Sequence, residues 1–220
     1  MVQLVIGNKN YSSWSMRAWV LLTHFRIEFE EIRIPLFTED YQLALARYSP
    51  SLKVPALVGD ELTLWDSLAI SEYISEKYLQ GGALPEDQSI RAVCRAYCYE
   101  MHSGFFEIRN QLPMNCRQRR RINISAALQG EIDRMDVLWS EAFSSRVSDE
   151  DYLFGKFSMA DSFFAPVASR FRTYGIELSA PAQAYAERLL NNPAVEAWVK
   201  GAKSESESLP DFEMGVEISD

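Results

Sequence analysis

Apolar residues follow two different spacings in the first 80 residues, and together these spacings predict a mixed α/β unit. Short apolar runs that favour strands occupy residues 3–6, 29–34, 54–58 and 63–65. Helical spacing of apolar residues occupies residues 15–24, 38–47 and 66–78. The predicted order is βαβαββα. Its βαβ half implies parallel strands and the tight turn at Gly59-Asp60 implies an antiparallel pair, so we expect a mixed sheet.

The second part of the chain is predicted to be all-helical. Turn residues at 81–85 separate it from the first part, so we expect a first domain at 1–80, a linker at 81–85 and a helical-bundle domain at 86–203. Helices are predicted at 86–112, 123–143, 158–174, 181–191 and 193–203. No run there predicts a strand. Residues 204–220 are an acidic extension, for which two alternatives stay open: a mobile tail, or a segment folded over the cleft.

The charge of the chain argues against nucleic-acid binding. Lys and Arg number 22 and Asp and Glu number 31, giving a net charge of −9. Since no net positive field exists to release counterions from a polyanion, we expect no nucleic-acid partner. The basic cluster of Arg117 with Arg119, Arg120 and Arg121 is interpreted as a solvated loop or helix end, and the alternative is a site for an anion.

The cysteines and the apolar runs exclude several other classes. Cys94, Cys98 and Cys116 form no CxxC motif, and only His24 and His102 could join them, so neither a disulfide framework nor a metal site is expected. No run approaches the roughly 20 apolar residues of a membrane helix. The start of the sequence lacks the basic region of a secretory signal. We therefore expect a cytoplasmic protein with no membrane partner.

Serines gather where the first strand leads into the first helix. Ser12, Ser13 and Ser15 can each cap that helix, whose first N–H groups lack internal partners. A helix start of this kind also favours an anion, including a thiolate. From spacing alone, plain capping and anion binding both remain open.

Two further dipeptides offer binding groups. The bond before Pro55 can be cis at low cost, and an extended ligand could then pair with the Val54 backbone as an added strand. Asp66 and Ser67 precede the third helix and could hold an ammonium and a carboxylate, although ordinary capping explains them too. Ser158 and Asp161, in contrast, have the spacing of a structural capping box.

In this order, the serine-rich helix start, Val54-Pro55, Asp66-Ser67 and the Ser158/Asp161 cap resemble the cytosolic glutathione transferase family, from about residue 4 to residue 203. The resemblance implies a thioredoxin-like N-terminal domain, an all-helical C-terminal domain, a homodimer, glutathione as co-substrate and a detoxification role. It also implies residues that bind glutathione: Ser15, Arg17, Lys53, Val54, a cis Pro55, Asp66 and Ser67.

The sulfur partner implied by the resemblance is a serine. No tyrosine ends the first strand and no cysteine precedes Cys94, so the tyrosine and cysteine types are disfavoured. The string from Ser12 to Arg17 is similar to the zeta-class motif, with Trp14 in place of cysteine. On that match Ser12 aligns with the family's catalytic serine and Ser13 follows it. The resemblance thus implies that Ser12 or Ser13 is catalytic, and that its hydroxyl stabilises the glutathione thiolate as a hydrogen-bond donor.

The electrophile is expected against the first helix of the second domain, where helical spacing groups Met101, His102, Phe105 and Arg109. His102 could be a polar contact of the substrate, and the alternative is a purely structural role. Arg109 or Arg117 could steer an acidic electrophile. The predicted function is conjugation of glutathione to a small electrophile. The alternatives are a maleylacetoacetate-type isomerase, a dehalogenase, or a non-catalytic interaction module on the same fold.

Overall fold

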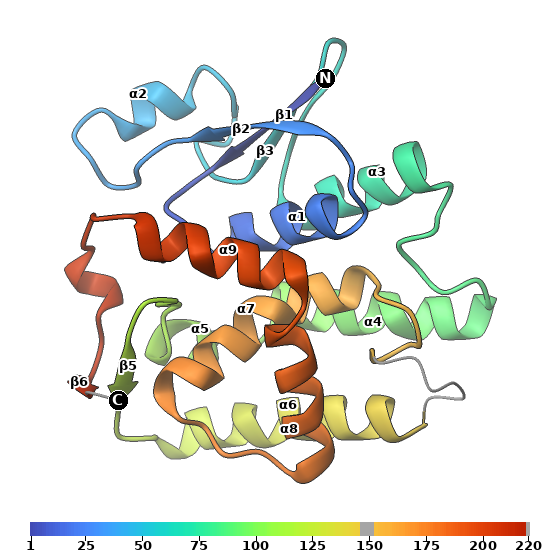
Figure 1. Cartoon of the computed structure of the whole chain (residues 1–220), viewed down its shortest axis with the longest axis vertical. Helices are drawn as coiled ribbons and strands as arrows, with labels where there is room; N and C mark the ends of the chain where they lie inside the picture. The colour runs from blue at the N-terminus through green and yellow to red at the C-terminus, as the bar shows by residue number, and fades with distance from the viewer. Residues whose placement is uncertain (146–151, 219–220) are drawn as a thin grey trace.

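A computed structural model describes residues 1–145 and 152–218. Its four-stranded sheet has the order β2-β1-β3-β4 (Figure 1). The strands are β1 (Val2–Ile6), β2 (Phe29–Arg33), β3 (Ala56–Val58) and β4 (Thr63–Trp65). β1 is parallel to β2 and antiparallel to β3, and β4 is antiparallel to β3, so the predicted mixed sheet is confirmed.

Alternating side chains of β1 divide the first part of the core between the two faces of the sheet. Leu4 and Ile6 face the helices α1 (Ser13–His24) and α3 (Ser67–Leu79). Val5 faces the other way, toward Leu45 of α2 (Tyr41–Leu45). The helix predicted at 38–47 is shorter in the structure, where it begins at Tyr41 and ends at Leu45. Residues 38–40 precede it as turn and bend, and the Asp40 side chain makes no capping hydrogen bond.

The rest of the chain is mainly helical, as predicted. The helices are α4 (Gln88–Ser103), α5 (Phe106–Gln111), α6 (Ala126–Ser145), α7 (Met159–Tyr174), α8 (Ala180–Leu190) and α9 (Pro193–Ser204). The single helix predicted at 86–112 is wrong. Gly104 ends α4, and Phe105 has a φ of 57°, in the left-handed region that breaks a right-handed helix. The domain division at 81–85 stays a prediction.

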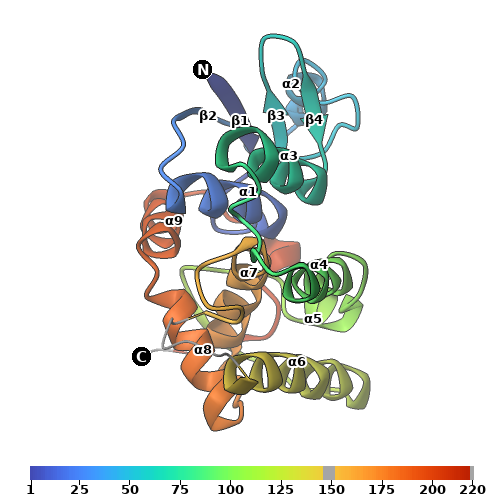
Figure 2. The same ribbon diagram turned by 90° about the vertical axis from the view of Figure 1, so that its right-hand side faces the viewer.

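Helix α7 runs through the centre of the helical part (Figure 2). Its predicted capping box is confirmed: the Asp161 carboxylate accepts hydrogen bonds from the Ser158 backbone at 2.7 Å and the Ser158 hydroxyl at 2.8 Å. The Tyr185 hydroxyl donates to the same carboxylate at 2.8 Å. Burial raises the pKa of Asp161 to about 6.

One apolar cluster joins the sheet-bearing part to the helical part. Met16 and Trp19 of α1 belong to the same cluster as Ala165 of α7 and Trp198 of α9, and the rings of Trp19 and Trp198 are 5.4 Å apart. Helix α1 is therefore covered by the sheet on one side and by α7 and α9 on the other (Figure 1).

The segment after α9 packs against the body of the protein, so of the two alternatives for the acidic tail the folded one holds for residues 205–218. It contains a 3₁₀ turn (Pro210–Phe212) and the strand β6 (Val216–Ile218), which pairs with β5 (Arg119–Arg121). Short strands in the second part were not predicted. Within the part of the chain that the structure describes, no helix has the length and apolar character needed to cross a membrane.

Candidate functional site

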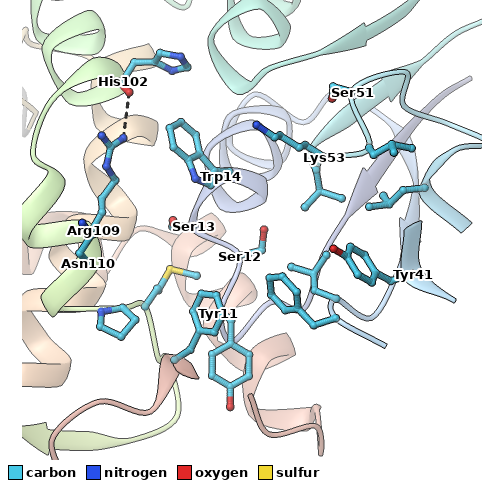
Figure 3. A pocket seen from close by; sticks show the side chains of 18 of the residues that line it. Tyr11, Ser12, Ser13, Trp14, Tyr41, Ser51, Lys53, His102, Arg109 and Asn110 are labelled. Atoms are coloured by element: carbon cyan, nitrogen blue, oxygen red, sulfur yellow. Dashed lines mark hydrogen bonds between the residues drawn. The ribbon is translucent and has the colours of Figure 1, made fainter. Parts of the chain in front are cut away.

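A cavity of about 920 Å³ lies where the start of α1 meets α4, α5 and α7 (Figure 3). Its volume is within the usual range for small-molecule sites. Among the predicted site residues, six line it: Ser12, Ser13, Lys53, Val54, His102 and Arg109. The other seven predicted residues do not: Ser15, Arg17, Pro55, Asp66, Ser67, Met101 and Phe105.

The three serines at the start of α1 have different partners. Ser12 is the N-cap residue, and its hydroxyl donates to Ser15 Oγ at 2.7 Å and accepts from the Ser15 backbone at 3.4 Å. Ser15 is fully buried and also accepts from the Gly7 backbone at 3.2 Å. Ser13 Oγ accepts from the guanidinium of Arg170 at 2.9 Å. Ser12 and Ser13 therefore face the cavity, while Ser15 supports the loop from behind.

Trp14 forms an aromatic wall of the cavity (Figure 3), and two arginines lie near its rings. The guanidinium carbons of Arg17 and Arg109 lie 4.3 and 5.3 Å from the centre of its rings. Arg17 is 2% exposed and also lies over Phe163. Burial, with the nearby charges of Arg109 and Arg170, lowers the pKa of Arg17 to about 9, so it stays charged at neutral pH.

Lys53 borders the cavity beside the sheet (Figure 3), and Val54 also lines it. The Val54–Pro55 bond is cis, as the resemblance implied. Pro55 is buried, immediately before β3. The Val54 backbone, with Lys53 next to it, is thus presented on the same cavity as Ser12.

Asp66 caps α3 by accepting hydrogen bonds from the Leu68 and Ala69 backbone at 2.8 and 3.3 Å. Its φ of 79° is rare for a residue with a side chain, and such strain concentrates at functional sites. The second carboxylate oxygen lies 3.2 Å from His102 Nε2. Burial lowers the pKa of His102 despite this contact, so the ring is mostly neutral at neutral pH.

The break between α4 and α5 changes which residues of the second part reach the cavity. Met101 and Phe105 are buried in the core, so the prediction that they contact the electrophile is not supported by their position. Phe106 lines the cavity instead and is largely exposed. Arg109 donates to the His102 carbonyl at 3.1 Å (Figure 3). Burial lowers the Arg109 pKa, and the Glu131 carboxylate acts in the opposite direction.

The segment after α9 closes one end of the cavity. Phe212 lines it, with its ring centre 5.6 Å from Phe37 and 5.8 Å from Tyr11. Arg117 donates to the carbonyls of Glu205 and Glu207 at 2.6 and 2.7 Å.

Arg120 is buried and donates to three consecutive carbonyls of the same segment, those of Glu213, Met214 and Gly215. The interpretation of this basic cluster as solvated is therefore wrong for Arg117 and Arg120.

Sequence reasoning missed Arg170 and the aromatic residues Phe37, Tyr41, Phe106 and Phe212. The sequence did offer a signal for Arg170, because this charged residue is flanked by the small Ser169 and the apolar Phe171 within a predicted helix. The described residues contain no group of three or more His, Cys, Asp or Glu side chains able to hold a metal.

A thioredoxin-like mixed sheet followed by an all-helical part, with a ligand-sized cavity at the start of α1, defines the glutathione transferase fold. Residues 11–77 match the family described as glutathione S-transferase, N-terminal domain. A solved glutathione transferase homologue from Burkholderia, with bound glutathione, is 25% identical and superposes with a TM-score of 0.72, covering 93% of this chain and 99% of that one. Residues 11–77 therefore carry a glutathione S-transferase N-terminal domain, and the chain as a whole has the fold of that family.

Its homologues include zeta-class enzymes. The rat maleylacetoacetate isomerase is 29% identical over 178 residues, which cover 76% of this chain and 78% of the rat protein. A probable maleylacetoacetate isomerase of Caenorhabditis elegans is 32% identical over 99 residues, which cover 45% of this chain and 46% of that protein. The match thus spans about half the length of the nematode relative. The predicted resemblance to the glutathione S-transferase family is confirmed, and the homologues include enzymes of that family.

Proposed function

We propose that the protein is a glutathione transferase that stabilises the glutathione thiolate and joins it to a small electrophile. The observation that carries the proposal is the shared cavity, where the hydroxyls of Ser12 and Ser13 at the start of α1 face the same space as the Val54 backbone. A free thiol has a pKa near 8.5, and a donor at a helix start lowers it. A thiol pKa that falls by one corresponds to about 1.4 kcal/mol of selective thiolate stabilisation.

The binding mode in this proposal extends glutathione along the sheet-bearing part. Val54 pairs with the cysteinyl backbone, and Lys53 balances the glycyl carboxylate. Asp66 and Ser67 hold the γ-glutamyl head, whose ammonium replaces the present contact between Asp66 and His102. The buried Ser67 hydroxyl supports this role, because it has no hydrogen-bond partner within the described residues.

The electrophile occupies the part of the cavity between Trp14 and Phe106. The thiol proton passes to solvent first, and the thiolate then forms a C–S bond with the electrophilic carbon. In an activated aryl halide the carbon–halogen bond breaks, and the halide leaves with its electron pair. In this proposal the protein acts in the cytoplasm as a homodimer, and the exposed apolar residues Ile90, Val93 and Tyr99 of α4 supply a surface for a second copy.

Calorimetric titration with glutathione in two buffers of different ionisation enthalpy tests the proposal, because it measures binding and proton release together. Binding with proton release is the expected result. Saturable binding without release and without turnover would favour the non-catalytic module, and absence of binding would contradict the proposal.

Isomerisation of an acidic enone is a second candidate, favoured by the isomerase relatives and by Arg109 on the cavity wall. Turnover of an activated aryl halide and of a cis-enone acid distinguishes the two reactions. Arg109→Ala should reduce turnover of acidic electrophiles more than that of neutral ones, and Arg109→Lys, which keeps the charge, should retain the preference. Equal losses for both kinds of electrophile would remove the steering role.

A further inference from the structure

Arg170 of α7 is a buried charge that reaches across to the start of α1. Arg170 is only 5% exposed. One guanidinium nitrogen donates to the carbonyls of Arg109 and Leu112, and the other donates to Ser13 Oγ at 2.9 Å. Burial and the charge of Arg109 lower its pKa to about 10, so it remains protonated at neutral pH. Across residues 1–145 and 152–218, no carboxylate lies within ion-pair distance of it.

The hydroxyl protons of Ser12 and Ser13 are used differently. Ser12 donates its proton inside the protein, in the 2.7 Å hydrogen bond to Ser15 Oγ. Ser13 Oγ accepts a hydrogen bond from Arg170, and none of the described residues accepts the proton of its own hydroxyl. A hydroxyl has one proton to donate, and Ser13 lines the cavity, so its proton is available to a ligand there.

We propose that Ser13, rather than Ser12, donates to the glutathione sulfur, and that Arg170 is the residue that positions it. By occupying a lone pair of Ser13 Oγ from the α7 side, the guanidinium turns the hydroxyl proton toward the cavity. Its unpaired charge also favours a thiolate over a thiol at that place, since the surroundings are poorly solvated. The glutathione proton goes to solvent and the serine keeps its own. This inference rests on the proposed function, and it departs from the zeta-like motif, which points to Ser12.

The ultraviolet absorbance of the bound thiolate, followed against pH, measures the pKa of the glutathione thiol in the site. Ser12→Ala and Ser13→Ala form a matched pair, because the two residues are adjacent, equally buried at 6% exposed, and each loses one hydroxyl. Ser13→Ala should raise the pKa of bound glutathione by about 1, which is a tenfold smaller thiolate-to-thiol ratio at a given pH. Ser12→Ala should raise it less and instead lower the unfolding temperature, because it removes the cap of α1. Ser13→Thr, which keeps the hydroxyl, should restore the low pKa.

Arg170 is tested in the same titration. Arg170→Met should raise the bound-thiol pKa in the same direction as Ser13→Ala, and Arg170→Lys, which keeps the charge, should give an intermediate value. Arg170 also binds carbonyls at the end of α5, so each variant is checked by circular dichroism, and the serine pair decides the question if Arg170→Met does not fold.

The outcomes separate this inference from the proposed function. A wild-type protein that lowers the thiol pKa, together with a Ser12→Ala variant whose thiol pKa rises as much as that of Ser13→Ala, would overturn the role of Ser13 and leave the transferase proposal standing. An unchanged pKa in a folded Arg170→Met protein would overturn the role of Arg170. A wild-type protein that binds no glutathione, or binds it without lowering the thiol pKa, would overturn both proposals.

Discussion

Replacing Phe212 by alanine should release the segment after α9 from the cavity. Phe212 joins this segment to two loops of the sheet-bearing part, through its ring contacts with Phe37 and Tyr11. The carboxylate of Glu205 anchors the other end of the segment, since it accepts hydrogen bonds from the Lys9 and Asn10 backbone at 2.7 and 3.0 Å. Phe212→Ala thus removes the apolar anchor and leaves the polar ones, which are the hydrogen bonds of Glu205, Arg117 and Arg120.

The expected magnitude follows from the two ring contacts. Each aromatic pair contributes about 0.5–1.5 kcal/mol beyond the area it buries. Loss of both pairs therefore weakens the closed state of the segment by about 1–3 kcal/mol. The constant for local opening should rise by about 5- to 150-fold, which is the equilibrium equivalent of that free energy.

Amide hydrogen exchange of residues 209–218 measures this opening constant directly. Met214→Ala is the control, because Met214 belongs to the same segment, is 39% exposed and does not line the cavity. Phe212→Ala should also raise KM for a bulky electrophile while leaving glutathione affinity much less affected. If its amides lose no more protection than those of Met214→Ala, the reasoning from the ring contacts is wrong.

The remaining predictions concern stability and assembly. Asp161→Ala should cost about 3–5 kcal/mol in chemical denaturation, because buried donors of Ser158 and Tyr185 lose their acceptor. Relative to Asp161→Asn, the wild type should lose stability as pH rises through about 6, since its raised pKa favours the protonated folded state. His24 should act in the opposite direction: burial lowers its pKa, so stability falls as pH drops below about 6.5, and His24→Phe should remove that dependence in the same measurement. Val93→Glu should convert the proposed dimer to a monomer in light scattering, and an unchanged mass would exclude α4 as the interface.

The local sequence pattern was sufficient to predict those elements whose signal lies in residues close together in the chain. The strands of the sheet and the helices α1 and α3 follow from apolar spacing, and the Ser158/Asp161 cap follows from a pair three residues apart. The break before α5 could not be predicted in this way, because a left-handed Phe105 leaves the helical spacing of its neighbours intact.

The parts that sequence reasoning missed depend on contacts distant in the chain. An acidic segment without apolar periodicity is typical of disorder, and its order here comes from guanidinium groups about 90 residues away, those of Arg117 and Arg120. Ser13 was a candidate from the helix start alone, whereas its distinction from Ser12 comes from Arg170, 157 positions along the chain.

The shared cluster around α1 has a consequence for how the protein unfolds. Trp19 of α1 contacts Trp198 of α9, and Ala165 of α7 belongs to the same core, so separating the two parts would expose both sides of that core to water. The sheet-bearing part and the helical part should therefore melt in one cooperative transition rather than as independent units. Because the serines lie at the start of this same helix, the geometry around the sulfur is lost together with the global fold, and no half-folded intermediate should retain catalytic competence.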